Sequence, residues 1–149
     1  MASVTVSIEI AASPETVFDT AVNLHAWPEM IEDIISVELL GDGPVAVGTV
    51  FRETRKMFGK EATEEMTFES IERPHGYVLT AHSCGNHYVT TSRLEPTATG
   101  TRLHVEFNGR PEKLLAWLLL PMGWMLKGMI RKCLQKDLAC VKVWIEARN

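Results

Sequence analysis

Cysteine is scarce in this sequence, which excludes a small scaffold held together by disulfides. The 149 residues include three cysteines, Cys84, Cys133 and Cys140, and an odd, sparse set is no disulfide framework. Cys133 and Cys140 are seven residues apart and so share one face of an expected helix, but no further ligand follows at zinc spacing. We interpret these residues as small buried thiols in a reducing compartment, and we expect neither a metal nor a cofactor.

An excess of positive charge is also missing. Lys and Arg number 15 against 19 Asp and Glu, for a net charge of −4, whereas binding to a phosphate backbone needs clustered cations. We therefore expect no nucleic-acid partner. The apolar fraction of 46% is typical of a folded globular chain, and the length predicts a single domain over residues 1–149.

The start of the chain lacks the basic segment and apolar run of a secretory signal. Residues 1–6 alternate between apolar and polar side chains, so we expect no signal peptide and a cytoplasmic location. Val6, Ile8 and Ile10 continue the alternation, which is the period-two pattern of a half-buried strand. The sequence therefore predicts a strand as the first element.

The remaining pattern predicts an α+β fold with a long series of consecutive strands. Ser13 and Pro14 are typical of a helix start, because serine caps free N–H groups and proline suits the first helical position. Short turns rich in Gly and Pro separate the strands, which favours an antiparallel meander. The expected elements are a strand over 4–10, a helix from 14 to about 23, a short helix over 29–31, strands over 34–40, 49–57, 60–71, 77–83, 87–94 and 101–108, and a helix from 112 almost to 149.

Residues 114–126 would be apolar around the full circumference of a helix. Such a run extends about 20 Å, less than the hydrocarbon core of roughly 30 Å, and Pro121 would kink it by removing a backbone donor. A transmembrane span is therefore not expected. Three interpretations stay open: the run lines a core or cavity, forms a dimer face, or surrounds a cavity mouth that touches a membrane.

Five features follow one another along the chain: residues 13–18 after the first strand, residues 23–28, Gly48-Thr49, Leu94-Glu95-Pro96 before Gly100-Thr101, and the terminal amphipathic helix. Their order and spacing resemble the helix-grip superfamily (SRPBCC, or START-like). It includes START lipid-transfer domains, birch-pollen-allergen-like proteins and polyketide cyclase/dehydratase proteins, and the similarity is greatest to the bacterial cyclase/dehydratase branch. The resemblance covers nearly the whole chain. It implies a curved seven-stranded antiparallel sheet that grips the C-terminal helix, two short helices after the first strand, and an elongated apolar cavity.

Alternation along the strands indicates which side chains face that cavity. Leu103, Val105 and Phe107 share one face of the last strand, so His104 is expected on the surface. Tyr88 has the parity of Leu94, and an inward Leu94 would bring the Tyr88 hydroxyl into the pocket.

The strand over 49–57 leaves two interpretations open. Glu53 and Arg55 have the parity of Phe51, and if they face inward they form a semi-buried ion pair that offers a polar end to a ligand carboxylate or carbonyl. The more usual arrangement for such residues is an exposed surface pair.

The five histidines are scattered, and no pair has the spacing of metal ligands on one element. His82 and His87 flank one turn and can approach each other across a hairpin. One of them would suit a general base in a cyclase, while the simpler interpretation is a pair of partly exposed hairpin residues. No Gly-x-Ser-x-Gly or other nucleophile motif is present, and Gly41-Asp42-Gly43 lacks the Lys-Ser/Thr pair of a phosphate-binding loop, so we interpret it as a turn.

Two functions are compatible with these features. The first is binding of a hydrophobic or amphipathic small molecule, such as a lipid, quinone or polyketide, for transport or sequestration. The second is a cyclase or dehydratase that uses Arg55, Tyr88 and His82 or His87, although fold alone does not decide between them. The catalytic residues stay unassigned. Peripheral membrane contact and a homodimer are open as further partners. The expected ligand-binding residues are Trp27, Phe51, Arg55, Phe68, Tyr88, Phe107, Trp117 and Met122.

Overall fold

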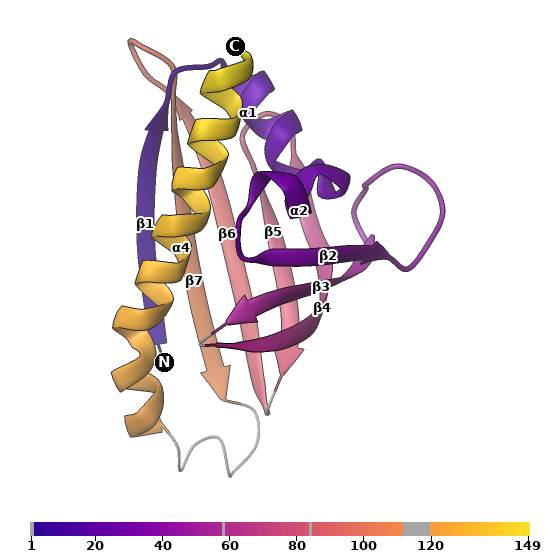
Figure 1. Ribbon diagram of the computed structural model, residues 1–149, viewed down its shortest axis with the longest axis vertical. Coiled ribbons are helices and arrows are strands. Elements are labelled where there is room, and N and C mark those ends of the chain that lie inside the picture. The colour runs from indigo at the N-terminus through magenta and orange to yellow at the C-terminus, as the bar shows by residue number, and fades with distance from the viewer. Residues whose placement is uncertain (1, 58, 84, 112–119) are drawn as a thin grey trace.

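The computed structural model shows one continuous antiparallel sheet of seven strands, in the order β1-β7-β6-β5-β4-β3-β2, together with a long C-terminal helix (Figure 1). It describes residues 2–57, 59–83, 85–111 and 120–149, and within these the side chains of residues 2, 111 and 120–126 are not described. The fold predicted from the sequence, a curved seven-stranded sheet with a long terminal helix and short helices after the first strand, is confirmed.

The strands follow the alternation read from the sequence, with ends that differ by a few residues. They are β1 (Ala2–Ile10), β2 (Ile34–Leu39), β3 (Val50–Met57), β4 (Lys60–Glu72), β5 (Gly76–Ser83), β6 (Asn86–Pro96) and β7 (Thr101–Pro111). Consecutive strands from β2 to β7 pair with each other, and β1 returns to pair with β7 over its whole length. The meander expected from the short turns is therefore present.

Three short helical segments connect β1 to β2: α1 (Pro14–Ala21), the 3-10 turn η1 (Leu24–Ala26) and α2 (Trp27–Met30). α1 starts as predicted, because the Ser13 side chain accepts a hydrogen bond from the Thr16 backbone N–H. The second helix begins at Trp27, two residues earlier than expected, because Pro28 fits within a first helical turn.

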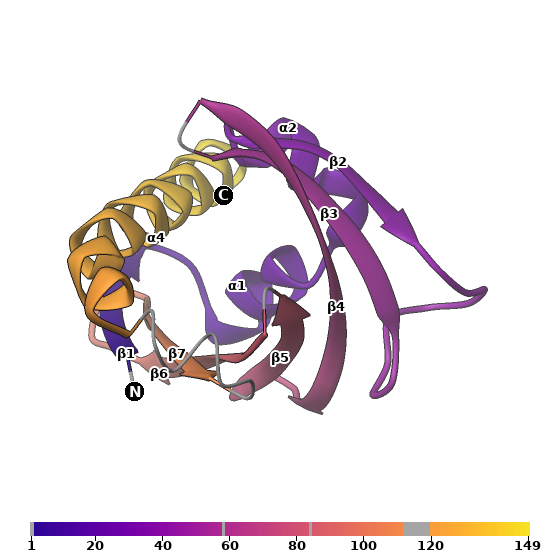
Figure 2. The same ribbon diagram turned by 90° about the horizontal axis from the view of Figure 1, so that it is seen from below.

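The helix α4 (Leu120–Arg148) packs along β1 and crosses the concave side of the sheet (Figure 2). Its apolar stripe faces inward as the sequence predicts: Leu138, Val141 and Ile145 are buried, and Ile130 and Leu134 pack against the core. Residues 112–119 lie outside the described part of the chain, and the side chains of 120–126 are not described. The apolar run over 114–126, which has three interpretations from the sequence, thus lies outside the described side chains. No helix within the described residues is long and apolar enough to cross a membrane.

The centre of the core is a row of aromatic rings near one end of the sheet. Trp27 meets Phe51 edge to face with ring centroids 5.6 Å apart, Phe51 lies 5.6 Å from Phe68, and Phe68 lies 5.9 Å from Tyr77. The Trp27 indole also donates a 3.0 Å hydrogen bond to the Ala21 carbonyl, which ties α2 to the end of α1. Trp27 and Tyr77 also line the cavity described below, so part of this aromatic row forms its wall.

Candidate functional site

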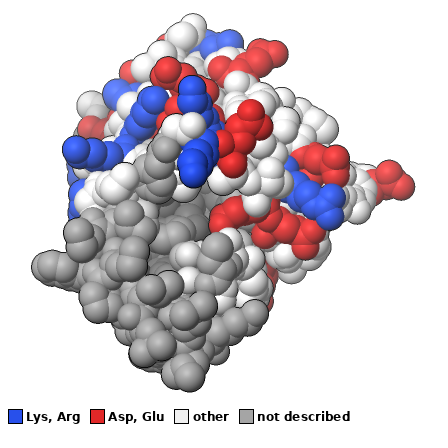
Figure 3. Space-filling model, turned by 60° about the horizontal axis from the view of Figure 1, so that its bottom comes forward, with Lys and Arg blue, Asp and Glu red and all other residues white. Residues whose placement is uncertain are grey.

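A cavity of about 370 Å³ lies between the concave face of the sheet, α2 and α4. Seen with the bottom of the molecule turned toward the viewer, the surface is hollowed, and acidic side chains gather beside the hollow (Figure 3). The apolar lining consists of Ala21, Trp27, Met30, Ile31, Ile34, Met57, Ala62, Met66, Leu79, Ala81, Leu103, Val105, Phe107, Ile130, Leu134, Leu138 and Val141. The polar lining consists of Glu53, Arg55, Glu64, Tyr77, Thr80, Tyr88, Thr90, Ser92, Cys133 and Asp137.

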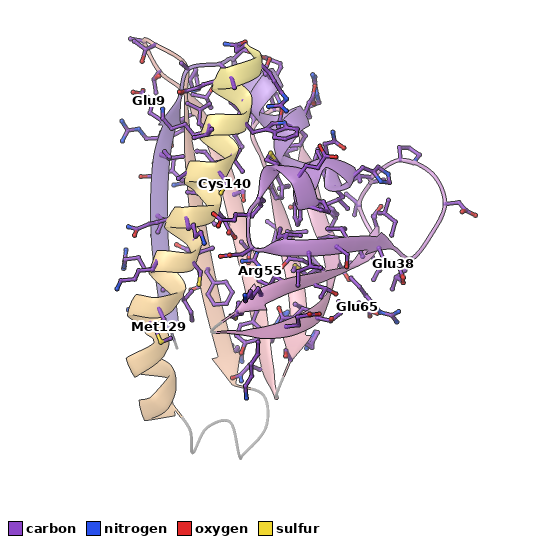
Figure 4. The ribbon with its side chains drawn as sticks, viewed as in Figure 1. Glu9, Glu38, Arg55, Glu65, Met129 and Cys140 are labelled. Carbon is purple, nitrogen blue, oxygen red and sulfur yellow. The ribbon has the colours of Figure 1, made fainter. Side chains whose placement is uncertain are left out.

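The charged end of the cavity begins on β3. Phe51 is fully buried, and residues two and four positions further along a strand lie on the same face, so Glu53 and Arg55 also point inward. In Figure 4, Arg55 lies at the end of β3 that approaches α4. The interpretation of these two residues as an exposed surface pair is wrong, because the parity of Phe51 decides the face and places them in the cavity.

Arg55 bridges two carboxylates that come from different elements. Its Nε donates a 2.6 Å hydrogen bond to Glu53 Oε1, and its Nη2 donates a 2.9 Å hydrogen bond to Asp137 Oδ2 on α4. All three side chains are mostly buried. The group therefore joins the sheet to the helix across 82 residues of sequence, and charge-assisted hydrogen bonds of this length are among the stronger polar contacts in proteins.

The surroundings shift the titration of these groups. Burial alone would lower the pKa of Arg55, but the charges of Glu53 and Asp137 and their hydrogen bonds raise it above its usual range. Burial raises the pKa of Asp137, and the neighbouring Arg55 only partly opposes that effect. Burial, followed by the charge of Asp137, also raises the pKa of the Cys133 thiol, so Cys133 is a poor nucleophile at neutral pH.

The cluster carries more negative than positive groups. Glu64 stands directly opposite Glu53 on the paired strand β4 and also lines the cavity, although like charges opposite each other destabilise a sheet. Asp137 Oδ1 is buried and has no hydrogen-bond partner among the described residues. Such an arrangement offers hydrogen-bond acceptors to the cavity.

Hydroxyl groups occupy the floor of the cavity between the charged end and the aromatic core. Tyr77 is buried and hydrogen-bonded to Ser92, and burial raises its pKa. Tyr88 stacks on Phe107 with ring centroids 5.4 Å apart, and both residues line the cavity. Tyr88 has the inward parity of Leu94, as predicted.

Of the eight residues expected to bind ligand, four line the cavity: Trp27, Arg55, Tyr88 and Phe107. Phe51 and Phe68 have no exposed surface and pack in the aromatic core, so they do not line it. Trp117 lies outside the described residues, and Met122 lies in α4 where side chains are not described.

Asp137 was not among the predicted site residues, although the sequence carries a signal for it. On a helix, Asp137 shares a face with Leu134 and Val141, three and four residues away, and a carboxylate within an otherwise apolar stripe is unusual. Glu64 was not predicted either, and it has the same strand parity as Ala62 and Met66.

The histidine pair is formed but lies on the other side of the sheet. His82 and His87 are paired across the hairpin, and their rings stack at 4.4 Å between centroids. Their neighbours Ala81 and Tyr88 line the cavity, so successive residues place the two imidazoles on the outer face. A cavity general base at His82 or His87 is therefore excluded by this geometry. His104 also lies on the outer face, 3.4 Å from a carboxylate oxygen of Glu95.

No group of three or more His, Cys, Asp or Glu side chains with the geometry of a metal site occurs within the described ranges. Cys133 and Cys140 are free thiols, each half-buried, and Cys84 lies outside those ranges.

Comparison with solved structures shows which folds are similar. A START superfamily protein from Mycobacterium smegmatis matches with a TM-score of 0.81 at 14% identity, covering 100% of both chains. The protein Ara h 8.0201 matches with a TM-score of 0.77 at 16% identity over 97% of both chains. The di-domain ARO/CYC StfQ from the steffimycin biosynthetic pathway matches with a TM-score of 0.79 at 14% identity, covering 99% of this chain and 52% of that one. At these identities the likeness shows the fold alone.

Comparison of sequences shows the family. No curated protein matches the chain in sequence. The sequence profile described as "Polyketide cyclase / dehydrase and lipid transport" matches residues 1–137, which is most of the chain. The resemblance drawn from its motifs is thereby confirmed: the chain belongs to the polyketide cyclase/dehydrase and lipid-transport family, and its helix-grip fold is like that of the START superfamily protein.

Proposed function

We propose that this chain binds a hydrophobic or amphipathic small molecule in the cavity, for transport or sequestration. The observation that carries the proposal is the cavity of about 370 Å³ with a mainly apolar lining. An apolar cavity of about 150 Å³ holds benzene, so this space suits a ligand of about 15 non-hydrogen atoms. The family includes lipid-transport proteins by its description, which supports the same function.

The proposal gives each part of the lining a task. Trp27, Tyr88 and Phe107 contribute aromatic surface to the body of the ligand, while Arg55 and its carboxylates surround the polar end. Phe51 and Phe68 support the lining from behind by fixing Trp27 and Tyr77. Contacts from Trp117 and Met122 remain a prediction.

A paired substitution on β4 tests the proposal. Ala62 lines the cavity, and its neighbour Thr63 is exposed on the outer face, so Ala62→Phe fills the cavity while Thr63→Phe adds the same ring to solvent. We expect Ala62→Phe to weaken binding of the neutral fluorescent probe N-phenyl-1-naphthylamine by about tenfold or more, because the added ring displaces ligand contacts. Thr63→Phe should bind the probe as the unaltered protein does.

Native mass spectrometry of the freshly purified protein provides an independent measurement. A carrier should retain a bound apolar molecule, and extraction with organic solvent should release it. If the unaltered protein neither carries such a molecule nor binds the probe, the binding function is refuted. Equal probe binding by the Ala62→Phe and unaltered proteins would place the site elsewhere on the chain.

A second candidate is a cyclase or dehydrase acting in the same cavity, and the observation that favours it is Asp137. Burial raises the pKa of this carboxyl, and raised carboxyl pKa values suit general acids. Tyr88 and Arg55 lie on the same cavity surface. An enzyme should convert a poly-β-keto thioester to a cyclised product, and Asp137→Asn should reduce turnover by about 100-fold or more. Glu65→Gln, on the outer face, is the matched control.

A further inference from the structure

The polar end of the cavity has little left to offer a ligand carboxylate. A guanidinium recognises a carboxylate best with two parallel N–H donors, but two nitrogens of Arg55 already bind Glu53 and Asp137. Those two carboxylates come from β3 and α4, and among the described residues they leave Nη1 as the guanidinium nitrogen without a carboxylate partner. A ligand carboxylate at Arg55 would therefore share a guanidinium whose single positive charge already serves two carboxylates.

The net charge of the cavity lining also disfavours a ligand carboxylate. Among the described residues the cavity is lined by three carboxylates, Glu53, Glu64 and Asp137, and by one guanidinium. Even if Asp137 holds a proton, the remaining charges do not become positive. An anion that enters this partly desolvated space meets repulsion that solvent screens poorly.

One acceptor in the cluster is free to take a hydrogen bond. Asp137 binds Arg55 through Oδ2, while its Oδ1 is buried without a partner among the described residues. A buried acceptor without a donor is costly, and a donor that reaches it gains correspondingly. By contrast, Tyr77 and Ser92 are hydrogen-bonded to each other.

We propose that the ligand carries a hydrogen-bond donor without negative charge, a hydroxyl or a protonated amine, that binds at Asp137, and that the cavity rejects the carboxylate of the same apolar chain. This inference rests on the binding function proposed above and adds the chemical class of the ligand. In this proposal the carboxylates of the cluster accept hydrogen bonds from the ligand, and Arg55 holds Glu53 and Asp137 in place.

The test compares three probes with one apolar chain: 1-decanol, decylammonium and decanoate. The cavity suits a ligand of about 15 non-hydrogen atoms, and each of these probes is smaller than that. Isothermal titration calorimetry at neutral pH should give affinities for decanol and decylammonium that exceed the affinity for decanoate by about tenfold or more. The order of decanol and decylammonium then tells whether the preferred head is neutral or cationic.

Variants locate the preference. Asp137→Asn removes one negative charge and should reduce the decanol-to-decanoate ratio by about tenfold, because an amide accepts a weaker hydrogen bond and Arg55 keeps fewer carboxylate partners. Glu64→Gln removes the same charge without touching Arg55 and should give a smaller change. Glu65→Gln, its exposed neighbour, should give none. Circular dichroism verifies that each variant is folded, and the comparison on the unaltered protein requires no variant.

The outcomes separate the two proposals. Decanoate that binds as tightly as decanol to the unaltered protein would overturn the donor preference and leave the binding function intact. A preference for decanol that is unchanged in both Asp137→Asn and Glu64→Gln would overturn the assignment to this cluster. If none of the three probes binds, and N-phenyl-1-naphthylamine does not bind either, the binding function itself fails, and the donor preference fails with it.

Discussion

Two arginines stand three residues apart on β3, and each contacts two carboxylates. Arg52 lies on the outer face, 3.5 Å from both Glu38 and Glu65, whose labels in Figure 4 lie on the side of the molecule away from α4. Arg55 lies on the inner face, 2.6 Å from Glu53 and 2.9 Å from Asp137. The same residue types on one strand thus form two clusters in different surroundings.

Exposure separates the two clusters more clearly than distance does. The side chains of Arg52, Glu38 and Glu65 are 51%, 68% and 55% exposed, whereas those of Arg55, Glu53 and Asp137 are 14%, 7% and 16% exposed. Exposed pairs contribute little because water screens them and the side chains lose freedom. Buried charges have lost their hydration and depend on each other. We therefore expect the inner cluster to affect the stability of the fold because it is buried, and not merely because its residues form ion pairs.

The largest effect should come from removing one arginine at a time. Arg55→Met leaves two carboxylates buried without a cation, and we expect it to lower the free energy of unfolding by about 3 kcal/mol or more. Arg52→Met leaves two solvated carboxylates and should change it by less than about 1 kcal/mol. Urea unfolding followed by circular dichroism measures both. Equal losses for the two variants would contradict the comparison.

A triple variant tells whether charge or packing causes that loss. Glu53→Gln, Arg55→Met and Asp137→Leu together remove the three charges that contact each other in the inner cluster, and they keep similar side-chain volumes. Apolar replacements of whole buried ion clusters are often neutral or stabilising, so the triple variant should regain most of the stability that Arg55→Met loses. If it is as unstable as Arg55→Met, the loss comes from packing of the Arg55 side chain.

The pH dependence of stability should have opposite signs at a buried and an exposed aspartate. The pKa of Asp137 is raised above its ordinary value of 3.8, chiefly by burial. The folded state therefore binds this proton more tightly than the unfolded state does. The stability that Asp137 contributes is lost as the pH rises from 3.8 through the raised pKa. The pKa of exposed Asp19 is lowered, first by its hydrogen bonds from Arg73. Its contribution is therefore lost as pH falls through the lowered pKa.

The variants Asp137→Asn and Asp19→Asn test the sign of each pH dependence. The free energy of unfolding in urea is measured for both from acidic to neutral pH. Relative to the unaltered protein, Asp137→Asn should become more stable as pH rises, and Asp19→Asn should become less stable. A common sign for both variants would show that burial does not control the titration of Asp137.

The difference between the two faces of β3 also explains what the sequence could and could not predict. The fold follows from local patterns, because alternation, turns and helix caps each depend on neighbouring residues. On β3 both faces carry charged residues, so alternation alone left Glu53 and Arg55 undecided. Only the burial of Phe51 against Trp27, a contact between distant residues, settles the face.

The candidate site was harder to predict for the same reason. Asp137 meets Arg55 across 82 residues, and no local pattern indicates that pairing. Phe51 and Phe68 were expected to line the cavity, because aromatic residues suit both a lining and a core. In the structure their rings pack together, since close-packed apolar side chains stabilise the fold more than a wall facing empty space.

Salt should produce the smallest difference between the two clusters, and it tests the comparison without changing the buried contacts. Raising the ionic strength from about 0.1 M to about 1 M shortens the Debye length from about 10 Å to about 3 Å, which screens exposed charges and affects buried pairs much less. The cost of Arg52→Met should therefore fall toward zero, by about 0.5 kcal/mol or less, while the cost of Arg55→Met stays the same. Urea unfolding of both variants and the unaltered protein at the two salt concentrations measures this. A cost of Arg55→Met that falls in parallel with that of Arg52→Met would mean that solvent ions reach the inner cluster as freely as the outer one.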